Sequence, residues 1–263
     1  MNALSTQQVL IIGCGSAGCA VAAILKEAAV PAYILAADDS EELLGKAVAD
    51  KKILFGEGEK PDLGIDFSQY PVVLFALQPS EGSALTHAQY IASAALAANA
   101  YTYGFLIKPS GGWGEDDKSI YRSFDGAALI DEGWVLEVRK GKDPEYAMRI
   151  ALNFTAHVLG ILAEALSENK LTPGALKTIT MGKLSCFAAT ATSEPNTIFD
   201  LTMSKIDKNQ VRSMILFMPE DTDQVRERRA FLMISRSVPQ STEIEAIRVK
   251  RVEPFRILAM LAT

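Results

Sequence analysis

Three glycines that follow an apolar run carry the clearest chemical signal in the chain. Residues 9–18 read Val-Leu-Ile-Ile-Gly-Cys-Gly-Ser-Ala-Gly, so a short apolar strand leads directly into Gly13, Gly15 and Gly18. Glycines at this spacing allow a tight turn, and the first N–H groups of the helix that follows can bind a phosphate. A strand-to-helix turn that holds no ligand can show the same pattern. The candidate glycine loop consists of Gly13, Cys14, Gly15, Ser16, Ala17 and Gly18.

Two carboxylates, Asp38 and Asp39, stand about 20 residues beyond the glycine loop, after an apolar run at 32–36 that predicts a second strand. In dinucleotide-binding folds, an acidic residue at this distance binds the ribose. The same position could instead begin a helix, with Asp39 or Ser40 as its N-cap. Both interpretations stay open on the sequence alone.

An NAD(P)-dependent oxidoreductase of Rossmann type would use the glycine loop together with these carboxylates. The sequence contains no Tyr-x-x-x-Lys pair, and its two histidines, His87 and His157, both fall in helical patterns. No acid–base constellation for hydride transfer is therefore evident. We keep the oxidoreductase as an alternative interpretation.

Composition limits the remaining function classes. The 263 residues are 49% hydrophobic and carry a formal charge of -6, with an isoelectric point near 5.1, which argues against a nucleic-acid surface. No basic residue precedes Lys26, and no apolar run reaches the roughly 18 to 20 residues of a membrane span. The three cysteines, Cys14, Cys19 and Cys186, form neither a metal-spaced cluster nor a disulfide framework. We expect a cytoplasmic protein without membrane insertion, bound metal or nucleic-acid partner.

The elements that position the glycine loop follow from the hydrophobic pattern. Short apolar runs alternate with helical patterns up to about residue 170, which indicates parallel β-α-β units. Helices are expected at 19–29 and 86–98. The expected strands are 9–12, 32–36, 52–55, 71–76, 102–107 and 134–138.

A long helix is predicted at 143–168, because Asp143-Pro-Glu is a good helix start and the pattern then continues for roughly seven turns. It is apolar nearly all round, so we expect it to be buried as a central strut. His157 lies within it and is expected to be a core or interface histidine.

Beyond residue 175, alternating and β-branched segments indicate a second sheet. Its strands are expected at 178–192, 211–218, 231–238, 246–252 and 255–261. Two helices are expected between them, at 196–207 and 222–229.

This order of elements, together with the motifs, resembles the tubulin/FtsZ superfamily over nearly the whole chain. Residues 13–21 are similar to the first nucleotide loop of FtsZ, Gly-x-Gly-Gly-(Gly/Ala)-Gly-x-Asn-x-Val, with Ala20 in place of the asparagine. Residues 34–43 resemble the family's Ile-Ala-Val-Asn-Thr-Asp-Ala-Gln-Ala-Leu, and Lys-Ile-Leu-Phe-Gly follows at 52–56. The resemblance implies an α/β fold with a Rossmann-like, six-stranded parallel domain at 1–142, a central helix at 143–170 and a smaller α+β domain at 171–263.

The largest departure from the family lies in its signature loop, Gly-Gly-Gly-Thr-Gly-Thr-Gly, whose N–H groups cradle phosphates. This chain has Ser-Glu-Gly-Ser-Ala-Leu-Thr at 80–86, so only Gly82 and Ser83 keep the pattern. Glu81 brings a carboxylate to the place where phosphate oxygens would lie, and like charges repel in such a cleft. The resemblance would place Gly82, Ser83 and Asp39 beside the glycine loop around any nucleotide.

Further departures concern guanine recognition and hydrolysis. Acidic residues at 113–117 stand where the family has basic ones, and Leu152 replaces the aspartate that reads guanine, unless Asn153 substitutes for it. The family's Asn-x-Asp-x-x-Asp loop, which activates water in the next subunit, corresponds to Lys-Leu-Thr-Pro-Gly-Ala at 170–175. Without those acids we expect no GTP hydrolysis, and GTP or GDP binding that is weak or absent.

The resemblance therefore implies a non-catalytic cytoskeletal protein of the FtsZ type. We expect self-association, or regulation of a catalytic FtsZ-like partner, in a process such as cell division. Such subunits assemble head to tail through heterologous contacts.

Overall fold

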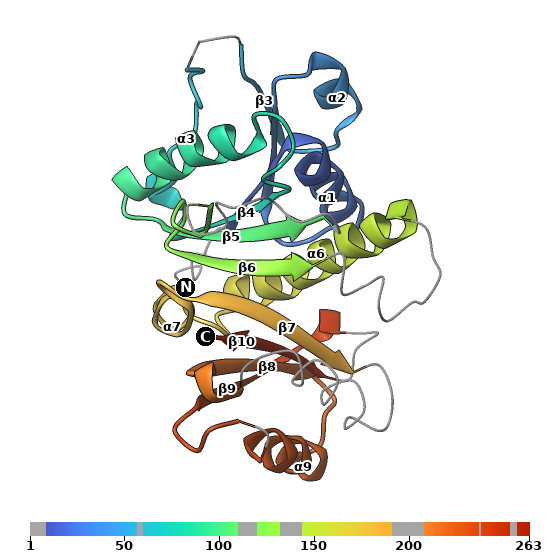
Figure 1. Cartoon of the computed structure of the whole chain (residues 1–263), viewed down its shortest axis with the longest axis vertical. Helices are drawn as coiled ribbons and strands as arrows, with labels where there is room; N and C mark the ends of the chain where they lie inside the picture. The colour runs from blue at the N-terminus through green and yellow to red at the C-terminus, as the bar shows by residue number, and fades with distance from the viewer. Residues whose placement is uncertain are drawn as a thin grey trace, which may run out of the picture.

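The computed structural model describes residues 9–56, 60–109, 120–131, 144–190, 208–236, 238–252 and 257–263. In this part of the chain, ten strands form one sheet in the order β3-β2-β1-β4-β5-β6-β7-β10-β8-β9 (Figure 1). The strands are β1 (Val9–Cys14), β2 (Tyr33–Asp38), β3 (Lys51–Leu54), β4 (Val72–Leu77), β5 (Tyr101–Lys108), β6 (Gly126–Asp131), β7 (Leu184–Thr190), β8 (Ser213–Pro219), β9 (Glu243–Val249) and β10 (Ile257–Ala262). The helices are α1 (Gly15–Glu27), α2 (Glu41–Lys46), α3 (Ala84–Ala97), α6 (Pro144–Ser167), α7 (Pro173–Thr180) and α9 (Gln224–Ser235). Single 3-10 turns are η1 (Phe67–Gln69), η2 (Lys208–Gln210) and η3 (Lys250–Val252).

The N-terminal part of the sheet is parallel, as predicted. β1 pairs with β2 on one side and with β4 on the other, so the strand order is 3-2-1-4-5-6. In such a sheet the order in which strands are added reverses between β1 and β4, and the loops that leave these two parallel strands meet outside their carboxyl ends. The glycine loop follows β1 and the Glu81 segment follows β4, so the topology brings them together.

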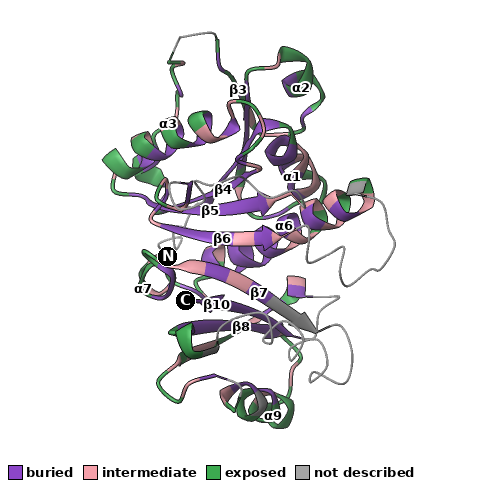
Figure 2. Ribbon diagram, in the orientation of Figure 1, coloured by how far each residue is buried: buried purple, intermediate pink, exposed green. Residues whose placement is uncertain are grey.

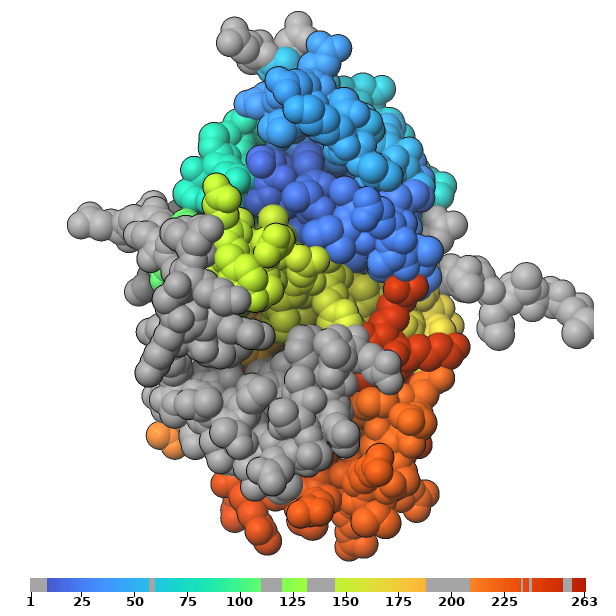
Figure 3. Space-filling view, turned by 90° about the vertical axis from the view of Figure 1, so that its right-hand side faces the viewer, coloured from blue at the N-terminus to red at the C-terminus, as the bar shows by residue number. Residues whose placement is uncertain are grey.

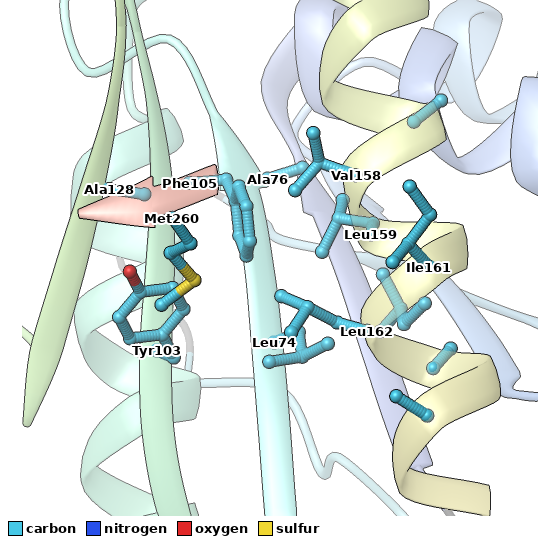
Figure 4. Packing of buried hydrophobic residues seen from close by; sticks show 14 of the residues in the cluster. Leu74, Ala76, Tyr103, Phe105, Ala128, Val158, Leu159, Ile161, Leu162 and Met260 are labelled. Atoms are coloured by element: carbon cyan, nitrogen blue, oxygen red, sulfur yellow. The ribbon is translucent and has the colours of Figure 1, made fainter. Parts of the chain in front are cut away.

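Alternate residues of each central strand face two different cores, as the pleat requires. Val9 and Ile11 of β1 belong to the cluster that α1 and α6 cover, while Leu10 and Ile12 belong to the cluster under α3. Figure 4 shows Leu74 of β4 facing side chains of α6 in the first cluster. Helices therefore cover both faces of the central strands β1, β4 and β5, which leaves these three strands almost wholly buried (Figure 2).

The predicted long helix is confirmed as α6, within one residue of the expected start and end. It is the one helix of the described residues with the length and hydropathy of a membrane span, but 67% of its apolar window is buried in the protein. Figure 3 shows it between the N-terminal and C-terminal parts, so it is a core helix. His157 is partly buried, and its Nε2 lies 3.4 Å from the carbonyl oxygen of Val252, as expected of an interface histidine.

The last part of the chain is also fastened to α1 and α6. The buried carboxylate of Glu164, on α6, accepts a hydrogen bond from Lys250 N at 2.6 Å. The guanidinium of Arg251 donates to the carbonyl oxygens of Ala28 and Ala29 at 3.0 and 2.9 Å. These carbonyls follow the end of α1, where a cation is favoured.

The prediction of a second sheet beyond residue 175 is wrong, because the described strands of this part continue the first sheet. β7 runs parallel to β6 over two residue pairs, Ala127 with Leu184 and Ala128 with Ser185. Beyond this seam, β10 is antiparallel to both β7 and β8, and β8 is parallel to β9. Pairing at the seam satisfies backbone groups that an open edge of β6 would leave exposed. The boundaries proposed at residues 142 and 170 stay a prediction.

Three segments differ from the predicted elements. The prediction of a strand at 231–238 is wrong, since α9 occupies residues up to 235. Asp223 caps this helix by accepting a hydrogen bond from Arg226 N at 2.8 Å. Ala230 and Ile234, four residues apart on the helix, face the core. The strand expected at 178–192 starts too early, because α7 extends to residue 180. The sixth strand is β6, at 126–131; the strand expected at 134–138 and the helix expected at 196–207 lie outside the described residues.

Candidate nucleotide-loop site

The glycine loop has the geometry of a tight strand-to-helix turn. A Cβ atom at Gly13 would lie 2.0 Å from the carbonyl oxygen of Gly18, and one at Gly18 would lie 2.3 Å from the carbonyl oxygen of Ala76. Gly13 is therefore required for the turn to close on the start of α1, and Gly18 is required for α1 to pack against β4. Gly15 has a φ of +73°, in the left-handed region that favours glycine.

Glu81 lies directly against this loop. Its Oε2 accepts a hydrogen bond from Ala17 N at 2.9 Å, in the first turn of α1. A Cβ atom at Gly15 would meet the Ala84 Cβ at 2.6 Å and Glu81 Oε2 at 3.3 Å. The free N–H groups and the dipole of a helix N-terminus favour a negative charge, and here a carboxylate of the chain itself supplies it.

The pKa of Glu81 is raised, chiefly because burial disfavours the charged form and also because Asp38 is near, although the bond from Ala17 N lowers it. The charged form of Glu81 is thus stabilised by one N–H group and disfavoured by its burial and by the charge of Asp38. A second anion at the same N–H groups would meet the charge of Glu81 at short range.

The two predicted ribose acceptors are both engaged within the chain. Asp38 is buried, and its Oδ1 accepts from Ser40 N at 2.7 Å; burial raises its pKa. Asp39 Oδ2 accepts a hydrogen bond from the hydroxyl of Ser83, which lowers the pKa of Asp39. The question of the helix cap is also settled, because Ser40 Oγ accepts from Leu43 N at 3.2 Å and caps α2.

His87 lies beside this acidic pair, which the sequence did not indicate. Its ring stacks on Phe55 with 4.0 Å between centroids, and its Nδ1 is buried without a partner among the described residues. Burial lowers the pKa of His87, although Asp39 and Asp38 act in the opposite direction. A neutral imidazole is therefore favoured at neutral pH. The signal that could have found it is its place four residues after Ser83, on the first turn of α3.

The predicted site residues do meet, at the carboxyl ends of the parallel strands: the glycine loop at 13–18 lies there together with Asp39, Gly82 and Ser83. The thiols beside them are not nucleophiles: Cys14 and Cys19 are buried, and burial raises the pKa of Cys19 to about 12. Among the described residues, no group of three or more His, Cys, Asp or Glu side chains could hold a metal ion.

The other predicted departures lie further along the chain. Residues 113–117 lie outside the described residues. Asn153 is exposed, and its amide donates to the carbonyl oxygen of Arg149 at 2.7 Å. Lys170 forms ion pairs with Glu168 at 2.7 Å and Glu220 at 2.6 Å, and Thr172 caps α7. The segment that follows α6 is thus used for ion pairing and helix capping.

Comparison with known proteins gives a match in structure but not in sequence. No protein-family model matches the chain, and no curated protein matches it significantly by sequence. An empty FtsZ dimer from M. jannaschii has a TM-score of 0.81 at 16% identity, covering 98% of this chain and 89% of that one. The GTPgS-bound protofilament of CetZ2 from Haloferax volcanii has a TM-score of 0.65 at 15% identity, covering 97% and 92%.

A more distant match is the TubZ of Clostridium botulinum phage c-st in its tail-truncated form. Its TM-score is 0.61 at 12% identity, covering 97% of this chain and 92% of that one. At these identities the likeness concerns the fold. The parallel sheet, the long central helix and the mixed C-terminal part are arranged here as in FtsZ, and over nearly its whole length the chain has the tubulin/FtsZ fold.

Proposed function

We propose that this chain is an FtsZ-like assembly protein that neither hydrolyses GTP nor binds GTP or GDP tightly. The observation that carries this proposal is the hydrogen bond from Ala17 N to the carboxylate of Glu81. A nucleotide phosphate would need the same N–H groups at the start of α1. It would have to displace an anion that is tethered to the chain and close to Asp38.

Loss of hydrolysis is supported by the segment after α6. Phosphoryl transfer to water needs a group that positions or polarises the attacking water. At 170–175 the chain offers a lysine in ion pairs and a threonine that caps a helix. No carboxylate stands in this segment.

Self-association is the role that this fold would retain. Two of the matched structures are described as a dimer and as a protofilament. By analogy, copies of this chain associate with one another or with an FtsZ-like partner. Regulation of a catalytic partner in cell division would fit such a subunit.

The alternative is a Rossmann-type NAD(P)-binding oxidoreductase, with which the strand order 3-2-1-4-5-6 is also compatible. Its ribose acceptor would be Asp38 or Asp39. Both carboxylates are bonded inside the chain, to Ser40 N and to the hydroxyl of Ser83. A dinucleotide would have to break these bonds and also displace Glu81.

Native mass spectrometry of the purified protein with added GTP, GDP or NAD(P) tests the proposal, together with an assay of phosphate release from GTP. We expect no stoichiometric nucleotide, no phosphate release, and oligomers that increase with protein concentration. Tightly bound GTP or GDP would overturn the claim of a closed site. Bound NAD(P) would favour the oxidoreductase, and a strict monomer would contradict assembly.

A further inference from the structure

Helix α9 presents an exposed apolar pair that the fold does not use. Val225 is 77% exposed and Leu232 is 50% exposed. Residues seven positions apart lie on the same side of a helix, two turns from each other. Ala230 and Ile234 are buried on the opposite side of α9, against β8 and its neighbours. The pair formed by Val225 and Leu232 therefore points away from the protein.

Basic side chains flank this pair on both sides. By helical position, Arg228 lies on one side of it and Arg229 and Arg236 lie on the other, and all three are exposed. Residues 224–236 contain four arginines and one glutamate, a net charge of +3 in a chain whose total is -6.

The one glutamate of this segment, Glu227, is already paired with Arg248, and Arg226 pairs with Asp223 at 3.3 Å. Arg228, Arg229 and Arg236 form no ion pair with any residue that the structure describes. An exposed apolar pair between unpaired arginines has no stabilising role in the fold itself.

A groove continues this surface at the end of α9. Its volume is about 500 Å³, and its walls include Phe231, Arg236, Val238 and Ile244. Ile244 belongs to β9, which is the edge strand of the sheet in the described residues, so the groove lies beside this edge. Arg236 belongs both to the wall of the groove and to the basic side chains that flank the apolar pair, so the groove and the pair are neighbours on α9.

We propose that this surface, made of the outward face of α9 and its groove, binds an acidic amphipathic helix of another protein. Apolar side chains of that helix, spaced by seven residues, would pack on Val225 and Leu232. Its flanking carboxylates would face Arg228, Arg229 and Arg236. The charge complementarity with the +3 segment carries the choice of partner.

Two other occupants fit the surface less well. A lipid surface would receive few exposed apolar side chains from this helix of 12 residues, namely Val225, Leu232 and the less exposed Phe231, which is little area for interfacial binding. A second copy of this chain offers no acidic helix of suitable length among the described residues: its exposed pair Glu41 and Glu42 lies on α2, which has six residues and in which Glu42 is bonded to Lys46. Longer described helices carry no such pair on one exposed face. The inference is independent of the nucleotide site.

A designed helical peptide tests the proposal on the full chain. The probe carries leucines at helical spacing with glutamates on both sides, labelled for fluorescence anisotropy, and the comparison peptide has the same composition in scrambled order. We expect the patterned peptide to bind at least about tenfold more tightly. Replacing both apolar residues (Val225→Ser with Leu232→Ser), or reversing two charges (Arg228→Glu with Arg229→Glu), should each weaken binding about tenfold or more, the charge reversal more strongly at low salt.

Control variants use exposed residues on other elements. Lys177→Glu with Arg212→Glu reverses two exposed charges outside α9, and Leu96→Ser removes an apolar side chain that is 42% exposed on α3. Both controls should bind as the parent does, and circular dichroism should show that every variant is folded.

Three results would overturn the proposal. Equal binding of the scrambled peptide would mean unspecific charge attraction. Binding to vesicles with anionic lipid, without binding to the patterned peptide, would make the surface a lipid contact. Loss of self-association on charge reversal, again without peptide binding, would assign it to a second copy of the chain.

Discussion

Replacing Glu81 with alanine tests whether its carboxylate is held by the N-terminus of α1. The variant loses the hydrogen bond from Ala17 N, made at 2.9 Å to a charged acceptor. Such bonds contribute about 1.5 to 3 kcal/mol when buried, and the interaction with the helix terminus adds about 0.3 to 1 kcal/mol. Glu81 is only partly buried, and the burial that raises its pKa opposes both effects. We therefore expect Glu81→Ala to lower the free energy of unfolding by about 1 kcal/mol.

Glu81→Gln separates the hydrogen bond from the charge. The amide oxygen can still accept from Ala17 N, while the opposed charge is gone, so we expect a change below about 0.5 kcal/mol at neutral pH. Because the pKa of Glu81 is raised in the folded state, the parent binds more protons when folded, and its stability falls as pH rises from the ordinary value of 4.5 through the raised pKa. The glutamine variant lacks this decrease.

Urea unfolding followed by circular dichroism measures these differences across acidic and neutral pH. Glu27 lies exposed at the end of α1, so Glu27→Gln removes a surface carboxylate as the matched control, and we expect its free energy of unfolding to stay close to that of the parent. Alanine and glutamine variants of Glu81 that are equally stable would refute the hydrogen bond. A parent whose stability rises with pH through the window, relative to Glu81→Gln, would refute the unfavourable burial.

Three further expectations follow from the same contacts. Gly18→Ala places a Cβ 2.3 Å from a carbonyl oxygen, so we expect it to prevent folding or to lower the free energy of unfolding by more than about 3 kcal/mol. At Gly45 an added Cβ would meet no atom within 4 Å, so Gly45→Ala should be neutral or stabilise α2, and thermal melts distinguish the two variants. Ser83→Ala should raise the pKa of Asp39 and remove about 0.5 kcal/mol at neutral pH, a loss that disappears as pH falls below that pKa, as NMR titration and urea unfolding would report. Leu162→Ala, at a fully buried position of α6, should lower the free energy of unfolding by about 2 to 5 kcal/mol, and an unchanged urea midpoint would contradict its place in the core.

Sequence patterns predicted the elements whose periodicity is strong. β1 and β4 are continuous apolar runs, and α6 combines a proline start with a long helical pattern, so each was found close to its observed bounds. β6 was missed because it starts with Gly-Ala-Ala, which has little β propensity; it is a strand because β5 offers it a partner along six residue pairs. The run Phe-Leu-Met-Ile at 231–234 suits both a strand and a helix, and Asp223, eight residues earlier, decides for the helix.

In the candidate site, too, the sequence predicts some contacts and not others. The position of Glu81 against the glycine loop could be expected from the loop motifs alone, because both loops leave neighbouring strands. The bond between Ser83 and Asp39 joins residues 44 positions apart, and the stacking of His87 on Phe55 depends on how α3 lies over β3. No spacing in the sequence encodes these contacts, since they arise from tertiary packing.

The seam between β6 and β7 gives the sheet an uneven resistance to load. Two residue pairs join these strands, whereas β4 and β5 share six pairs and so do β7 and β10. A force that pulls β9 away from β3 acts on every ladder of the sheet, and at the seam the contacts of α6, Lys250 and Arg251 carry part of it. The buried side chains of α6 belong to one hydrophobic cluster with Phe105 of β5 and Leu258 of β10, on the two sides of the seam. We therefore expect the sheet to bend under tension at Ala127 and Ala128 of β6, while α6 keeps the two parts of the sheet together.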